Sequence, residues 1–256
     1  MLASVRSENL LPAAWGESVW RADTLAQAAG VVLPSGYARL DATLPGGGWP
    51  LGALCELLQP PAQQHEWRLL LPGLCACAHR RACSVVLVGA PHTPFGPGLA
   101  AWGLDVSQLL WLKVDGAGER LWSAEQALRC DGVQAVLAWL PAVRATQLRR
   151  LHLAAQAQGK LLFVMRPASA RDEASPAVLR LLVQQGSGTG LAVQVLKRRG
   201  PPVTEALALD DRRAAFAVFL AAARAHNTPA EAVRYAHPAH SEPGSDHVLD
   251  CLAGAA

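Results

Sequence analysis

The first residues that could do chemistry follow the apolar run Ala53–Leu58, where a nucleotide-binding protein would carry its phosphate loop. Such a loop needs a glycine-rich turn whose backbone N–H groups point at the phosphates. It also needs a lysine for the β- and γ-phosphate charge and a Ser or Thr hydroxyl for magnesium. The window that starts at Gln59 reads Gln-Pro-Pro-Ala-Gln-Gln-His-Glu. The window stands where a phosphate loop would bind ATP, and its residue types show whether it can do so.

The residue types in this window do not match a phosphate loop. Gln59 and Gln64 stand at the two glycine positions, His65 stands at the lysine position and Glu66 at the Ser/Thr position. A carboxylate at the start of a helix would repel the phosphates, and the two prolines in the window lack a backbone N–H. New acid–base chemistry of His65 and Glu66 is the alternative, but no motif places a nucleophile or a second carboxylate beside them.

Two further positions that an ATPase needs are also changed. The strand expected at Ala135–Leu140 ends in Ala-Trp-Leu, where an aspartate would order magnesium. The strand expected at Ser84–Gly89 is followed by Ala-Pro-His, without a carboxylate to activate water. We therefore expect no ATP hydrolysis and no cofactor, and we expect Trp67 and Trp139 to fill the space of a nucleotide.

A second group with metal-ligand residue types is formed by Cys75, Cys77, His79 and Cys83. The stretch around them is apolar and alanine-rich, which is typical of a helix, and Cys75 and Cys77 would point to different faces of it. No second ligand pair with the spacing of a zinc site follows. We interpret these cysteines as reduced, small core residues and expect no metal.

The composition is that of a mildly basic chain that folds in water. Of 256 residues, 51% are hydrophobic and 17% charged, and the formal net charge is +3. This charge does not by itself indicate nucleic-acid binding. The longest apolar stretches, such as Ala214–Ala223, are shorter than the ~18–20 residues of a membrane helix. Met1–Trp20 lacks the pattern of a secretory signal. We expect a cytoplasmic protein without membrane contact.

Short apolar runs alternate with helix-period segments through the centre of the chain, which predicts an α/β fold. The expected strands are Ala53–Leu58, Ser84–Gly89, Leu109–Val114, Ala135–Leu140 and Leu161–Met165, and the expected helices are Trp67–Ala82, Pro97–Trp102, Ser123–Arg129 and Ala145–Gln158. The strands are apolar at successive positions, as in strands covered on both faces. We expect a mostly parallel sheet flanked by helices.

The flanking segments differ from this alternation. Val178–Val183 and Leu191–Leu196 predict a C-terminal antiparallel hairpin. Trp15–Ala29 predicts an N-terminal helix and Leu207–Arg224 a final helix. The expected organisation is an N-terminal helix and linker at 1–34, a core at 35–203, a C-terminal helix at 204–225 and a mobile tail at 226–256.

Several strings carry a resemblance to known families. SGYARLDATLPGGGWPLGALCELL (Ser35–Leu58) is similar to the segment before the phosphate loop in the RecA recombinase family, and its LPGGGWP variant resembles the ImuA family more closely. LAVQVLKRRGPP (Leu191–Pro202) is also ImuA-like. GLDVSQLLWLKV, VQAVLAWL and LLFVMRPASA, in the middle of the chain, resemble the related family of SulA. The resemblance implies a RecA-like fold with a degenerate nucleotide site.

The resemblance to ImuA implies a non-catalytic accessory role in SOS-induced, error-prone translesion DNA synthesis. It implies an ImuB-like, Y-family-related protein and an error-prone DNA polymerase as partners, with self-association or contact with RecA as further possibilities. The resemblance to SulA keeps a cell-division inhibitor open as the alternative. A single-stranded DNA-binding module is another alternative.

Trp49 and the basic run Lys197-Arg198-Arg199 are the candidate contact residues. The glycine turn before Trp49 favours a structural role for this side chain, and an exposed anchor for a partner is the alternative. Lys197, Arg198 and Arg199 end an expected strand. They are either a solvated strand end or a contact with DNA phosphates or a partner, and the phosphate contact would be weak and salt-sensitive.

Overall fold

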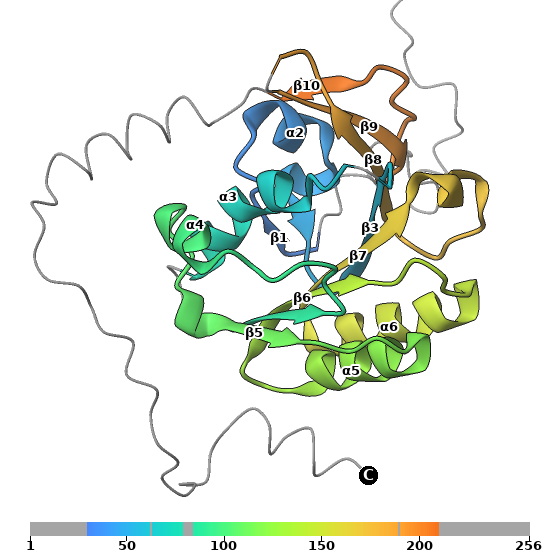
Figure 1. Ribbon diagram of the computed structural model, residues 1–256. Coiled ribbons are helices and arrows are strands. Elements are labelled where there is room, and N and C mark those ends of the chain that lie inside the picture. The colour runs from blue at the N-terminus through green and yellow to red at the C-terminus, as the bar shows by residue number, and fades with distance from the viewer. Residues whose placement is uncertain (1–29, 62, 79–83, 189, 210–256) are drawn as a thin grey trace, which may run out of the picture.

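A computed structural model describes residues 30–61, 63–78, 84–188 and 190–209 (Figure 1). The N-terminal helix predicted at Trp15–Ala29 and the tail predicted at 226–256 lie outside the described residues. None of the helices in the described part of the chain is long and apolar enough to cross a membrane.

The described residues form an eight-stranded sheet with the strand order β10-β9-β8-β3-β7-β6-β4-β5. Neighbours from β8 through β5 pair in parallel, whereas β9 is antiparallel to both β8 and β10. The prediction of a mostly parallel sheet with a C-terminal antiparallel hairpin is thus confirmed. The strands are β3 (Ala53–Gln59), β4 (Ser84–Val88), β5 (Leu109–Leu112), β6 (Val133–Trp139), β7 (Leu161–Pro167), β8 (Leu179–Gln185), β9 (Leu191–Lys197) and β10 (Leu207–Leu209).

Helices cover both faces of this sheet (Figure 1). The α-helices are α2 (Ala38–Thr43), α3 (Glu66–Ala78), α4 (Gly96–Ala101), α5 (Ala117–Arg129) and α6 (Ala145–Gln158). Short 3-10 turns lie at η2 (Pro45–Gly47), η3 (Val106–Gln108) and η4 (Ala168–Asp172), and β1 (Val32–Leu33) pairs with β2 (Trp49–Pro50) as a small separate ladder.

The strands divide their side chains between two apolar layers because alternate residues of a strand point to opposite faces. Cys55 and Leu57 of β3 belong to the layer under α2, α3 and α4. Leu54 of the same strand belongs to the layer under α5 and α6. Every residue of β3 is buried, which explains why its sequence is mostly apolar at successive positions.

Helix α6 has the bounds that the sequence predicts. Leu148, Leu151 and Ala155 are fully buried and form its apolar stripe. The helix is followed by Gly159, whose φ of 62° is the left-handed conformation that glycine adopts readily after a helix C-terminus. Helix α5 instead begins six residues before the predicted Ser123, because the backbone N–H of Gly116 donates to Glu119 Oε2 and caps an additional turn.

The helix predicted at Leu207–Arg224 is wrong at its start, where residues 207–209 form β10. These residues pair with β9, with Leu207 opposite Val193 and Leu209 opposite Leu191. Leu209 is buried against the main core, so pairing with the edge of the sheet overrides the local helical pattern. The rest of that predicted helix lies outside the described residues.

Candidate functional site

The phosphate-loop window joins the end of β3 to the start of α3, at the centre of the sheet. It opens at the edge where the parallel strands end, which is where open α/β sheets place their ligand sites. The Gln59 side chain bridges the window. Its Oε1 accepts the backbone N–H of His65 at 2.5 Å, and its Nε2 donates to Glu66 Oε2 at 3.0 Å. A side-chain amide therefore binds the backbone donor that a phosphate loop would offer to its ligand.

Glu66 places a buried carboxylate at the N-terminus of α3. The residue is 2% exposed, and burial raises its pKa. The backbone N–H of Glu66, the Gln59 amide, the charge of His92 and the Trp139 side chain act in the opposite direction. A helix N-terminus usually attracts an anionic ligand, but here the chain fills that position with its own acidic group.

The other two window residues contribute less to a site. The side chain of Gln64 is exposed and lines the cavity beside the window. His65 is 9% exposed and is not among the described residues that line this cavity. A lysine at this position would reach the phosphates, whereas His65 is held down by its backbone bond to Gln59.

The cavity beside the window has a volume of about 280 Å³. Trp139 and Arg120 line it together with several prolines. The guanidinium of Arg120 is already bound, since Nε donates to the carbonyl of Val114 at 3.0 Å and Nη1 to that of Trp139 at 3.2 Å. Of the described lining residues, Glu66 is the one carboxylate. These groups do not reproduce the cation and hydroxyl that a nucleoside triphosphate requires.

The two tryptophans expected in the space of a nucleotide are placed differently. Trp139 ends β6, where a magnesium-ordering aspartate would stand, and it lines the cavity. Trp67 packs against the main core and is not among the described lining residues.

A buried ionic cluster lies below the cavity, on three neighbouring strands. Glu56 of β3 is fully buried and binds Arg180 of β8, with 2.6 Å between Oε2 and Nε. Its Oε1 lies 3.4 Å from Nη1 of Arg166 on β7. Arg166 also binds Glu173 at 2.6 Å, and Arg180 donates to two carbonyls of η4. Sequence analysis did not identify this cluster. The signal it left is a charged residue inside two of the apolar runs, Glu56 and Arg180, and one directly after a third, Arg166.

Trp49 does not lie on the surface, which favours its structural role over that of an exposed anchor for a partner. It is 1% exposed and packs edge-on against Phe163, with ring centroids 5.3 Å apart. The preceding Gly48 allows the close approach of β1, because a Cβ there would lie 2.3 Å from the carbonyl oxygen of Leu33. The glycine turn therefore serves to bring Trp49 into the core.

The three basic residues at the end of β9 have different surroundings. Lys197 Nζ donates to the carbonyl of Ser175 at 2.9 Å. Arg198 donates to the carbonyls of Pro201 and Thr43, so its charge ties two loops to the sheet. Arg199 has no hydrogen bond or ion pair with any residue that the structure describes. Of the three side chains, Arg199 is the one whose charged group has no partner among the described residues.

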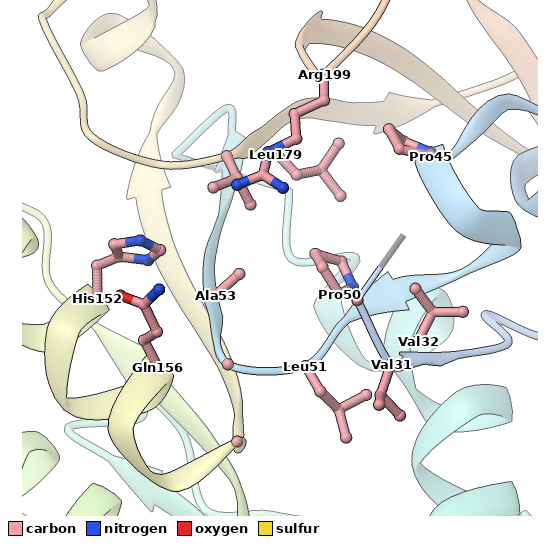
Figure 2. Close-up of a pocket in the computed structure, with 14 residues that line it drawn as sticks. Val31, Val32, Pro45, Pro50, Leu51, Ala53, His152, Gln156, Leu179 and Arg199 are labelled. Carbon is pink, nitrogen blue, oxygen red and sulfur yellow. The ribbon is translucent and has the colours of Figure 1, made fainter. Parts of the chain in front are cut away.

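Arg199 lines a second cavity, with a volume of about 380 Å³, at the opposite end of β3 (Figure 2). Ala53 begins β3 and Leu179 begins β8 at this edge, and His152 and Gln156 reach the cavity from α6. No sequence pattern identified this cavity, because its lining comes from segments that are far apart in the chain.

The cysteine group is described only in part. Cys75 is buried on α3, where burial raises the pKa of its thiol to about 11, and its Sγ donates to the carbonyl of Trp102. His79 and Cys83 lie outside the described residues. In the part of the chain that the structure describes, no three His, Cys, Asp or Glu side chains come together as metal ligands.

Comparison with known proteins gives relatives in two groups, and no protein-family model matches the chain. The chain is 36% identical to the cell division inhibitor SulA of Edwardsiella piscicida over 106 residues, which are 41% of this chain and 63% of that protein. It is 30% identical to the protein ImuA of Caulobacter vibrioides over 157 residues, which are 58% of this chain and 63% of that protein, in two strains. The chain thus spans less than two thirds of the length of these relatives. Two groups of relatives agree with the two resemblances in the sequence: the chain is related to the ImuA and SulA proteins.

Proposed function

We propose that this protein is a non-catalytic accessory factor of SOS-induced, error-prone translesion DNA synthesis and that it acts as an interaction scaffold. The observation that carries the proposal is the closure of the phosphate window by Gln59, His65 and Glu66 in a chain related to ImuA. A fold that no longer presents a phosphate site keeps its surfaces for contacts with other proteins.

The absence of catalysis is part of this proposal. Hydrolysis of a nucleoside triphosphate needs cations at the β- and γ-phosphates and a group that positions water. At the end of β3 the corresponding positions hold an amide, an imidazole and a buried carboxylate. Of the two arginines that line the cavity beside them, Arg120 donates to backbone carbonyls and Arg166 binds Glu56 and Glu173.

The partners proposed are an ImuB-like, Y-family-related protein and an error-prone DNA polymerase, in the cytoplasm. The test is co-purification of the full chain with the ImuB-like protein from cells treated with a DNA-damaging agent, with ATP hydrolysis assayed on the same material. We expect specific co-purification and no hydrolysis above background. ATP turnover that Glu66→Ala changes would refute the non-catalytic part, and failure to co-purify would refute the scaffold part.

Inhibition of cell division is the second candidate, because the relative named for that activity matches at 36% identity. Overproduction of the chain distinguishes the two functions. Filamentous cells in a strain that lacks its own division inhibitor would favour the SulA-like role, and normal division favours the accessory role.

Binding of single-stranded DNA has less support. Lys197 and Arg198 both use donors on backbone carbonyls, so fewer of their N–H groups remain for phosphates than the sequence alone indicates. A small number of phosphate contacts gives weak binding that falls steeply with salt.

A further inference from the structure

The cavity at the start of β3 has walls that the fold holds in place. The Leu51–Gly52 turn forms one wall, and it is fixed on both sides: Leu51 N–H donates to the carbonyl of Val31 at 3.0 Å and Gly52 N–H to that of Lys160 at 2.9 Å. A Cβ at Gly52 would lie 3.4 Å from the Cα of Gln156, so the turn packs directly on α6. The cavity is therefore preformed rather than opened by a ligand.

Most of the lining is apolar. The walls come from β1, β2, the turn before β3 and the start of β8, and the apolar side chains are those of Val31, Val32, Pro45, Pro50, Leu51, Ala53, Val178 and Leu179. Val31 is 75% exposed at the rim, which continues the apolar surface beyond the cavity. A volume of about 380 Å³ has room for a large apolar side chain.

One corner of this apolar cavity is basic. Arg199 comes down over the cavity from the chain after β9 and approaches His152 from the other side (Figure 2). Arg149, one turn before His152 on α6, adds a second positive charge there. Both charges lower the pKa of His152, although burial of the imidazole is the larger cause.

His152 is consequently neutral near pH 7, and its tautomer is fixed. Its Nδ1 accepts the backbone N–H of Leu54 at 3.1 Å, which leaves Nε2 as the ring nitrogen that carries the proton. The corner thus combines the cation of Arg199 with the neutral N–H donor of His152. Both groups suit a carboxylate, because charge-assisted hydrogen bonds from a guanidinium to a carboxylate are the strong ones.

We propose that this cavity is a docking site for a segment of a partner protein that carries a large apolar side chain next to a carboxylate. The apolar walls take the side chain and Arg199 takes the carboxylate. Nucleic acid fits less well, since the walls offer no row of cations along a phosphate backbone. This inference rests on the proposed scaffold role, which would supply the partner. The chemistry of the docked segment is argued from the cavity alone.

Peptide binding to the full chain tests the chemistry. The probe is a labelled peptide blocked at both ends, Ser-Asp-Leu-Trp-Glu-Ala-Ser, and its matched control has Asn and Gln in place of Asp and Glu. We expect the acidic peptide to bind roughly tenfold more tightly than the amide peptide, as one charge-assisted hydrogen bond implies. Equal affinity of the two peptides would overturn the proposal.

Two variants then assign the effect to the corner. Arg199→Ala should weaken the acidic peptide about tenfold and leave the amide peptide unchanged. Lys197→Ala removes the same charge two residues away, from a side chain that does not line the cavity, and should leave both affinities within about twofold. If Lys197→Ala weakens the acidic peptide as much as Arg199→Ala does, the contact is general surface charge and the site is refuted.

A photo-crosslinker at the wall identifies the occupant. With Leu51→p-benzoylphenylalanine in the full chain, the acidic peptide should be the main crosslinked product, and Arg199→Ala should reduce its yield. A crosslink to residues 1–29 or 210–256 of the same chain, or to a second copy, would replace the partner segment as the occupant and overturn the proposal. Peptide binding is measured on the isolated chain, whereas the scaffold role is tested by co-purification with the ImuB-like protein. Failure of the docking site and failure of the scaffold role are therefore seen separately.

Discussion

The two ends of β3 carry two largely apolar cavities that differ in the partners of their charged groups. At the carboxyl end, Gln59 and Glu66 are buried polar groups that bind each other, and the arginine beside them donates to carbonyls. At the amino end, about 20 Å away along a seven-residue strand, the walls are apolar and Arg199 has no partner among the described residues. At the carboxyl end the polar groups bind one another, whereas at the amino end Arg199 leaves its charge without a partner in the described part of the chain. Of the two ends, the amino end is therefore the one where we expect a contact with another molecule.

The largest effect is expected from the strand that joins the two ends. Glu56→Gln should lower the free energy of unfolding by about 3–5 kcal/mol, because it leaves Arg166 and Arg180 without their buried carboxylate. Urea unfolding followed by circular dichroism measures the loss. Glu173→Gln is the control: this side chain is 56% exposed, so its loss should cost less than about 1 kcal/mol. Equal losses would show that Glu56 does not hold the strands together.

A smaller effect is expected at the carboxyl end. Gln59→Ala removes the acceptor of His65 N–H and a donor to Glu66, and should lower the free energy of unfolding by about 1–3 kcal/mol. Gln64→Ala, at an exposed position of the same loop, should change it by less than about 0.5 kcal/mol. The same urea titration compares them, and no loss for Gln59→Ala would mean that water replaces the amide.

The charge of Glu66 gives a pH-dependent effect at this end. Because burial raises the pKa of Glu66 above its ordinary 4.5, the folded chain binds more protons than the unfolded chain between these two pKa values. The contribution of Glu66 to the free energy of unfolding is therefore most favourable at and below pH 4.5. This contribution is lost as the pH rises through the folded-state pKa.

Glu66→Gln should remove this loss of stability at rising pH. The urea midpoints of the parent chain and the variant, compared at several pH values, measure it. Above the folded-state pKa the variant should be no less stable than the parent chain. If the urea midpoints of parent and variant change with pH in the same way, the pKa of Glu66 is not raised in the folded chain.

The smallest effect expected is that of nucleotide. ATP with magnesium at millimolar concentration should leave the tryptophan fluorescence unchanged, since Trp139 lines a cavity without a free cation for phosphates. Saturable quenching by ATP would remove the distinction between the two ends.

The sequence predicted the central strands well because each is a buried apolar run, and α6 because its stripe and its terminal glycine are local signals. It did not predict β10, since Leu207 and Leu209 become a strand only by pairing with β9. Helix propensity and hydrophobic periodicity are local properties, so they do not show that these residues pair with the edge of the sheet.

The candidate site was predictable at its carboxyl end only as a set of residue types. The window showed that Gln59 and Glu66 replace a phosphate loop, but the bond between them depends on the path of the loop. The ionic cluster of Glu56 depends on three strands being neighbours. Arg198 and Arg199 are indistinguishable in the sequence, yet one is tied to carbonyls and the other reaches a cavity.

The hydrogen bonds of Gln59 also constrain how this loop can evolve. A single change of Gln59 to glycine would introduce one phosphate-loop residue, but it would leave the Glu66 carboxylate buried without its amide donor. A single change of Glu66 to serine or threonine would remove that carboxylate while the two prolines and His65 still prevented phosphate binding. No single substitution would therefore turn this loop into a phosphate loop, because Gln59, the two prolines, His65 and Glu66 would have to change together.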